Sequence, residues 1–250
     1  MKEELINNAE VISFTTPTSK CVYLHDRPMR MEYKYIKNCS LELCSRLTKR
    51  GWRRFGEYFS RPICNNCKEC LSIKIDANEF KLGRSAKRVY KRCTKEIDEI
   101  IIQKPTYCDE HLILHEKYHD HMRIKKNWKN YEITKKSFLE LYINGASNFG
   151  KEVLYIKDSK VIGIDFIDIL DDGISSIYFF YDPDFSYLGL GNFSMYKQFE
   201  FAKELNLRWI YIGYYVKDCN SLNYKSKYKP YYILVNEPKL DEAAIWRLHQ

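Results

Sequence analysis

The strongest constraint on the fold is a run of three strand-like segments in the second half of the chain. Residues 151–158, 160–170 and 174–182 are rich in Val, Ile, Tyr and Phe, as strands with a buried face are. Asp171–Asp172–Gly173 separates the last two segments and is typical of a hairpin turn. The three segments therefore predict an antiparallel meander.

The neighbouring segments predict the rest of this half. Helices are expected around 109–125 and 135–144, and Leu188–Gly191 opens a further helix that leads into a strand at 208–216. Two helices, a meander, a glycine turn into a helix and a further strand are the order of elements in the acetyltransferase-like (GNAT) fold. We expect an α+β protein with such a transferase domain at 105–250.

The first half predicts a smaller α/β region. Strands are expected at 21–25, 52–60 and 71–76, a helix at 38–50 that ends at Gly51, and a basic helix from about Arg84. The pattern breaks at Gln103–Lys104–Pro105. We place a boundary there, between a basic N-terminal domain at 1–104 and the second domain at 105–250.

Positive charge is concentrated in the first domain. The chain has 41 Lys and Arg against 33 Asp and Glu, a net charge of +8, and the excess lies entirely in residues 1–100. Cations in the basic helix recur every three or four residues and form one stripe, which suits RNA phosphates; a solvated helix face is the alternative. The stripe consists of Arg84, Lys87, Arg88, Lys91, Arg92 and Lys95. A second basic cluster, Arg46, Lys49, Arg50, Arg53, Arg54 and Arg61, supports the nucleic-acid interpretation.

Three of the nine cysteines have the spacing of a metal site. Cys64, Cys67 and Cys70 form C-x-x-C-x-x-C, and Cys21 is the favoured fourth ligand. The spacing does not separate zinc from an iron–sulfur cluster, and buried or reduced thiols are the alternative. Other choices for the fourth ligand are Cys39, Cys44 and Cys93.

A second metal motif is weaker. His115–Glu116 and His119 match H-E-x-x-H, but a zinc hydrolase also needs a third ligand and a cleft. We favour a partly exposed histidine stripe on a helix.

The glycine turn falls where an acetyl-CoA-dependent enzyme binds pyrophosphate. Backbone amides at a helix N-terminus suit phosphate. Ser186, however, stands where that pattern has Gln or Arg, which disfavours acetyl-CoA. The turn is equally suited to the 3′ end of an RNA that carries an acyl group.

Several separated motifs, in order, resemble one family. They are Cys21–Arg30, Gly51–Gly56, Tyr58–Pro62 with the cysteines, Asp168 with Asp171–Ser175, Tyr178–Asp184, Leu188–Gly191, Tyr211–Tyr214 and Tyr224–Lys225 before Pro230. The chain resembles the bacterial aminoacyl-tRNA-protein transferases of the N-degron pathway, relatives of eukaryotic arginyltransferase. The resemblance implies transfer of an amino acid from tRNA to the α-amine of a protein that begins with an acidic residue.

The resemblance also implies which amino acid is transferred. Leu24 stands where the arginyl enzymes have a second cysteine, as in the bacterial aspartate/glutamate leucyltransferases. We expect leucyl-tRNA as donor and proteins with N-terminal Asp or Glu as acceptors. His25, Phe55 and Gly189 depart from the family's Pro, Ser and Ser. The alternatives are an arginyl donor, an acetyl-CoA-dependent N-acetyltransferase, and an RNA-binding module without catalysis.

The resemblance and the chemistry of the reaction together give the candidate site residues. Asp168 and Lys225 are the catalytic candidates, and Asp168 as a hairpin-flanking residue is an equal alternative. Arg27, Arg30, Arg53 and Arg54 bind the acidic acceptor. The aminoacyl group and tRNA 3′ end contact Tyr178, Tyr181, Gly189, Gly191, Tyr211 and Tyr214, although tyrosines on strands are more often core residues.

The chemistry itself needs no cofactor, because the ester that joins an amino acid to tRNA is already activated. No run approaches the ~18 consecutive apolar residues of a membrane span, and acidic residues occupy the start of the chain. We expect a cytoplasmic protein that does not contact membranes.

Overall fold

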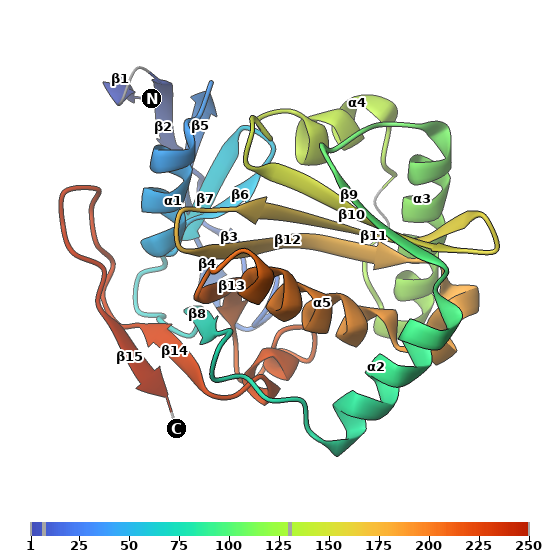
Figure 1. Ribbon diagram of the computed structural model, residues 1–250. Coiled ribbons are helices and arrows are strands. Elements are labelled where there is room, and N and C mark those ends of the chain that lie inside the picture. The colour runs from blue at the N-terminus through green and yellow to red at the C-terminus, as the bar shows by residue number, and fades with distance from the viewer. Residues whose placement is uncertain (1, 7–8, 130–131, 250) are drawn as a thin grey trace.

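Two sheets organise the computed structural model, which describes residues 2–6, 9–129 and 132–249 (Figure 1). The larger, eight-stranded sheet has the order β15 (Trp246–His249), β14 (Tyr231–Leu234), β8 (Leu71–Asp76), β13 (Trp209–Tyr215), β12 (Gly173–Tyr181), β11 (Lys160–Ile169), β10 (Gly150–Lys157) and β9 (Glu99–Gln103). The five-stranded sheet has the order β1 (Lys2–Ile6), β2 (Ala9–Thr15), β5 (Met31–Lys37), β7 (Tyr58–Pro62) and β6 (Arg53–Phe55). The fold is therefore mixed α+β.

The expected meander is confirmed. β10 pairs with β11 and β11 with β12, both antiparallel, and the chain reverses between Ile169 and Gly173. β13 then joins β12 in parallel. The side chains of these strands alternate between two cores, because both faces of the sheet are covered.

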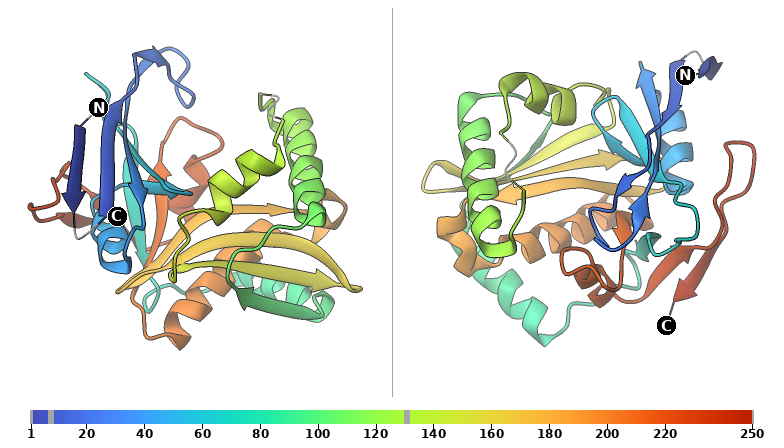
Figure 2. Two further views of the ribbon diagram at one scale, coloured as in Figure 1. Left: turned by 90° about the horizontal axis from the view of Figure 1, so that it is seen from above. Right: turned by 180° about the vertical axis from the view of Figure 1, so that it is seen from behind.

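Helices cover both faces of the larger sheet, as the left view of Figure 2 shows. One face packs against α3 (Asp109–Lys126) and α4 (Lys135–Phe138), which continues as the π-helical turn η1 (Leu139–Ile143). The other packs against α2 (Arg84–Glu96) and α5 (Leu190–Glu204), which follows the 3₁₀ turn η2 (Pro183–Leu188). A second 3₁₀ turn, η3 (Asn223–Lys227), precedes β14. No helix in the described ranges combines the length and apolar character that a bilayer span requires.

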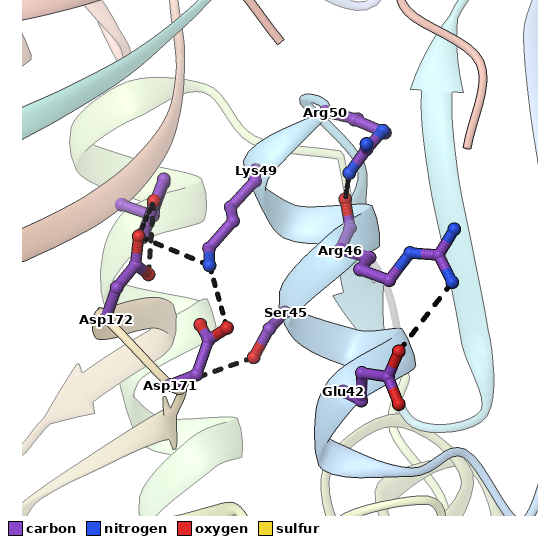
Figure 3. A network of polar contacts seen from close by, with 8 residues as sticks. Glu42, Ser45, Arg46, Lys49, Arg50, Asp171 and Asp172 are labelled. Carbon is purple, nitrogen blue, oxygen red and sulfur yellow. Dashed lines mark hydrogen bonds and ion pairs between the residues drawn. The ribbon is translucent and has the colours of Figure 1, made fainter. Parts of the chain in front are cut away.

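The smaller sheet and helix α1 (Leu41–Lys49) dock on the turn between β11 and β12 (Figure 3). Lys49 Nζ lies 2.8 Å from Asp171 Oδ2 and 3.4 Å from Asp172 Oδ2. The Asp171 amide donates to Ser45 Oγ at 3.2 Å. Beneath these contacts, apolar residues of α1, β2, β5 and β7 share one core with Leu170 and Tyr211, so the two sheets are held together.

Two strand predictions for the first half are wrong. Residues 21–25 form hydrogen-bonded turns, in which Cys21 N donates to Arg27 O at 2.9 Å, between the short strands β3 (Ser19–Lys20) and β4 (Pro28–Met29). Residues 52–60 form a hairpin, β6 and β7, instead of one strand. The chain turns at Gly56, whose φ is +59° and where a Cβ would lie 1.7 Å from Glu140 O, so that close approach requires glycine.

The division at residue 104 cuts through one sheet. β8 and β9 precede it, yet β8 lies between β14 and β13, and β9 pairs with β10. The two proposed domains therefore share a sheet, and a division of the chain at that residue stays a prediction.

Candidate functional site

The site begins where two central strands separate. β12 and β13 pair only from Gly173 with Trp209 to Ser175 with Tyr211, although β12 continues to Tyr181 and β13 to Tyr215. Beyond that point their facing carbonyl groups need other donors.

Two cations supply those donors from opposite sides. Arg53 Nη1 donates to Ser176 O at 2.8 Å and Nη2 to Ile177 O at 3.2 Å, both on β12. Lys225 Nζ donates to Ile212 O at 2.6 Å and Tyr214 O at 2.9 Å, both on β13. We call Arg53 and Lys225, with the strand segments they join, the cationic wedge.

A glycine makes room for Arg53. Gly213 of β13 has φ +75°, and a Cβ there would lie 2.5 Å from Arg53 Nη1. The β13–β8 register also shifts between Tyr211 and Gly213. An irregularity in β13 thus accommodates the guanidinium.

The wedge brings two basic side chains together without an ion-pair partner among the described residues. Neither Arg53 nor Lys225 makes an ion pair with a carboxylate among the described residues. Burial lowers the pKa of Arg53. Burial, and then the charge of Arg53, lower the pKa of Lys225 well below its usual value. A carboxylate arriving from outside would relieve both penalties.

The predicted base Asp168 and the predicted acceptor residue Arg54 bind each other instead. Arg54 Nε lies 2.7 Å from Asp168 Oδ2 and Nη2 lies 2.6 Å from Oδ1, and both side chains are buried. Arg54 Nη1 donates to Gly56 O at 2.8 Å. Successive side chains of a strand point to opposite faces, so Arg53 reaches the wedge and Arg54 points into the core.

The other predicted acceptor residues lie near the cysteines. Arg27 Nη1 is 3.5 Å from Glu69 Oε1 and from Cys67 Sγ, and Arg30 Nη2 donates to Thr15 Oγ1 at 3.0 Å. Arg27 thus contacts the cysteine segment and Arg30 contacts β2, and among the described residues neither contacts Arg53.

The four candidate metal ligands approach one another without forming a metal site. Burial, then the neighbouring thiols of Cys21, Cys64 and Cys67, raise the pKa of Cys70 to about 12. The Cys64 thiol donates to Arg30 O at 3.6 Å. In the parts of the chain that the structure describes, no group of three or more His, Cys, Asp or Glu side chains is placed to hold a metal ion. The zinc or iron–sulfur prediction therefore finds no support.

The H-E-x-x-H histidines form an aromatic stack. The rings of His115 and His119 lie 4.1 Å apart, and His119 Nε2 is 2.7 Å from the Tyr178 hydroxyl. Burial, then His119, lower the pKa of His115 to about 3, so His115 is neutral. The histidines pack against β12 as structural residues, but His115 is buried, so the expected partly exposed stripe is only partly correct.

The predicted phosphate stripe is exposed on α2. All six of its cations are exposed, and none makes an ion pair among the described residues. Arg92 Nη2 donates to Leu188 O at 2.9 Å, which ties the stripe to the glycine turn. There Gly189 has φ +78° and Gly191 is exposed at the start of α5.

The second basic cluster does not form a phosphate surface. Its cations make internal contacts that hold the two sheets and the C-terminal segment together. Arg46 donates to Leu240 O, Arg50 to Lys239 O and Glu242 O, Arg61 pairs with Glu32, and Lys49, Arg53 and Arg54 make the contacts described above.

The predicted tyrosines divide into two pairs. The Tyr211 hydroxyl donates to Asp172, and that of Tyr214 to Gly51 O and Ser60 O; both residues are buried. Tyr178 and Tyr181 are partly exposed on β12.

Sequence reasoning missed Asp165 and Gln198. Asp165 lies fully buried in β11, and Gln198 Nε2 of α5 donates to its Oδ2 at 2.8 Å. The signal was present, because a carboxylate interrupts the apolar run of residues 160–170.

Comparison with known proteins identifies the family of the chain. Residues 19–88 match the N-terminal part, and residues 110–235 the C-terminal part, of arginine-tRNA-protein transferase. The chain is 50% identical to the aspartate/glutamate leucyltransferase of Campylobacter jejuni over 94% of this chain and 97% of the relative. It is 36% identical to the enzyme of that name from Helicobacter hepaticus, over 96% of this chain and 98% of the relative. A solved structure, L-PGS from Bacillus licheniformis, covers 60% of this chain and 46% of its own with a TM-score of 0.45 and 14% identity. The protein belongs to the arginine-tRNA-protein transferase family.

Proposed function

We propose that the protein transfers leucine from leucyl-tRNA to the α-amino group of proteins that begin with Asp or Glu, and so creates a degradation signal. The cationic wedge is the observation that carries the proposal, because the partly buried Arg53 and the buried Lys225, which have no carboxylate partner among the described residues, suit an acidic side chain. The choice of leucine rests on the relatives named aspartate/glutamate leucyltransferase.

The acceptor side chain binds between the two strands. Arg53 and Lys225 lie on its two sides and keep N–H groups beyond those given to the strand carbonyls. When the carboxylate binds, its charge raises the depressed pKa of Lys225, so binding is coupled to protonation of that amine. Lys225 thus keeps its place among the catalytic candidates as an acceptor-binding group. Arg54 and Asp168 act by fixing the strand that carries Arg53.

Aminoacyl-tRNA binds across α2 and the start of α5. The exposed stripe Arg84–Lys95 tracks phosphates, and Arg92 connects it to the turn at Gly189 and Gly191, where the 3′ end lies. Tyr178 and Tyr181 stay candidates for contacts with the aminoacyl group, although the Tyr178 hydroxyl bonds His119 on the α3 side of the sheet. A GNAT-like arrangement of residues 105–250 is supported by the meander, the glycine turn into α5 and the separation of β12 from β13.

Positioning supplies most of the catalysis. The ester is activated, and holding two reactants in a reactive geometry can contribute roughly 7–11 kcal/mol. No covalent intermediate and no cofactor are required for this chemistry. Arg27 and Arg30 remain candidates for contacts with the acceptor peptide.

The location we propose is the cytoplasm, where charged tRNA is found.

Mass spectrometry tests the proposal. Asp-starting and Arg-starting peptides are incubated with the protein and either leucyl- or arginyl-tRNA. We expect leucine on the Asp-starting peptide alone. Addition of arginine instead would mean that the donor is arginyl-tRNA and that the type of reaction is as proposed. Acetylation from acetyl-CoA, or tRNA binding with no product from any donor, would overturn the proposal.

A further inference from the structure

Asp165 is a buried carboxyl group that makes no ion pair with any described residue. Its side chain has no exposed surface, and Gln198 Nε2 is the donor to Oδ2, at 2.8 Å. Among the described residues, Asp165 Oδ1, Gln198 Oε1 and the Tyr155 hydroxyl are buried without any hydrogen-bond partner. Each such atom costs about 1–3 kcal/mol, so a ligand group that supplied hydrogen-bond partners here would be bound favourably.

Asp165 is linked to the cationic wedge through one residue of β12. Gln198 Nε2 also lies 3.2 Å from Ser176 Oγ, and the carbonyl of Ser176 accepts from Arg53. The Tyr224 hydroxyl interacts electrostatically with both Arg53 of the wedge and Asp165. Tyr224 as a whole residue is 45% exposed.

An acidic N-terminal residue carries its ammonium group and its side-chain carboxylate a few bonds apart. A site for it needs a cation and an anion at matching separation. Arg53 and Lys225 provide the first, and Asp165 provides an anion on the adjoining strand.

We propose that Asp165 binds the α-ammonium group of the acceptor and removes its proton, and that Gln198 is a positioning residue that orients the carboxylate. This inference rests on the function proposed above. It assigns the base to Asp165 instead of Asp168, whose two oxygens are held by Arg54.

The protons balance as follows. The α-ammonium gives one proton to Asp165, and the free amine attacks the carbonyl carbon of the leucyl ester. As the C–N bond forms and the C–O bond to the ribose breaks, a second amine proton passes to the ribose oxygen, which leaves as the 3′-terminal hydroxyl of tRNA. Asp165 then releases its proton to solvent.

The acidity of the group suits this role. Burial raises the pKa of Asp165 to about 7, close to the ~7.7–8.0 of an α-amine. The titratable groups around it are Tyr155 from β10, Tyr224 from η3 and, through Tyr224, Arg53 from β6; Cys93 of α2 lies behind Tyr155. A base with a pKa near the working pH combines availability with driving force.

The test is single-turnover transfer by Asp165→Asn, with saturating leucyl-tRNA and an Asp-starting peptide, measured from pH 6.5 to 9. We expect a loss of about 10²-fold at pH 7, within the 10²–10⁴-fold range of general base catalysis. The loss should shrink to less than about tenfold at pH 9, because the α-amine is then largely neutral without help. Gln198→Met should show a smaller loss with the same dependence on pH.

Glu152→Gln is the matched control. Glu152 is also fully buried and has an oxygen without a partner, but its other oxygen accepts from Gln103 and Thr106 beside β9. This variant should transfer leucine at the wild-type rate.

The outcomes separate the two claims. Wild-type rates for Asp165→Asn at pH 7 would overturn the inference and leave the proposed function intact. A loss that is equal at every pH, or one accompanied by weaker tRNA binding, would show a structural role and also overturn it. No product from the wild-type protein would overturn both claims.

Discussion

Arg53 and Lys225 donate to carbonyl groups of different strands, Arg53 to β12 and Lys225 to β13, at the point where the two strands separate. Each cation replaces interstrand hydrogen bonds that the other strand would have supplied. The charge that suits an acidic substrate is therefore also part of the sheet, and a change at either residue affects both stability and transfer.

Gly213→Ala should displace Arg53. The new methyl group would overlap the guanidinium, and φ is +75° at this position, so we expect a loss of about 1–3 kcal/mol in unfolding free energy and a higher KM for Asp-starting peptides. Urea unfolding and peptide titration measure the two effects. Gly83→Ala is the control, because a Cβ there meets nothing within 4 Å; equal effects at both glycines would contradict the prediction.

Lys225→Met should abolish transfer to Asp- and Glu-starting peptides but change stability in a pH-dependent way. The pKa of Lys225 is lowered in the folded state from its ordinary value of 10.5. Between the two pKa values the unfolded chain binds more protons than the folded protein, so wild-type stability rises as the pH rises toward 10.5. The variant lacks this rise. Unfolding free energies at pH 7 and pH 10 should therefore differ less for the variant than for wild type, and parallel curves would argue against a depressed pKa.

Arg54 is expected to act on stability first. Removing it leaves the buried Asp168 carboxylate without its cation, which typically costs about 3–5 kcal/mol. We expect Arg54→Met to unfold at markedly lower urea concentration, and the double variant Arg54→Met, Asp168→Leu to recover part of the loss. A stable Arg54→Met protein that has lost only acceptor binding would contradict this prediction and would mean that Arg54 binds the acceptor directly.

Sequence alone predicted the second half of the fold better than the site. The meander and α5 were identified because apolar periodicity and the glycine turn are local signals. Arg53 and Arg54 received the same predicted role, since nothing in the sequence tells which face of β6 meets the separated strands. Only the packing of that hairpin on β12 assigns one to the wedge and the other to Asp168.

The first half was harder to predict for a similar reason. β1 and β2 form a local hairpin but have mixed side-chain patterns, whereas β2 pairs with β5 and β5 with β7 across intervening segments. The turn at Gly56 depends on a contact with Glu140. β14 and β15 likewise join the sheet beside β8, more than 150 residues earlier. Such pairings follow from tertiary contacts that periodicity does not encode.

The α2 stripe should control tRNA affinity through phosphate contacts. Changing Lys87, Arg88 and Lys91 to Ala should weaken binding and reduce the slope of log K against log salt by about 2–3, at roughly 0.7–0.9 per phosphate contact. Filter binding at several salt concentrations measures the slope. Lys68, Lys160 and Lys203, exposed elsewhere, give a control triple variant with the same net charge. A wild-type slope for the α2 variant would mean that the stripe is a solvated helix face.

Relative to wild type, Asp165→Asn should become more stable as the pH rises. The pKa of Asp165 is raised to about 7 in the folded state from an ordinary value of 3.8, so between these pH values the folded protein binds more protons than the unfolded chain. Wild-type stability therefore falls from about pH 4 to pH 7 on account of this group, and at about 1.4 kcal/mol for each pKa unit the total reaches several kcal/mol. Asparagine does not titrate, so the variant should be more stable than wild type at pH 8 and nearly equal to it at pH 4, as measured by urea unfolding. A variant that is less stable at pH 8 would mean that the carboxylate is stabilised in the free protein. A variant that is more stable and slower would identify Asp165 as a group kept for the reaction at a cost to the fold.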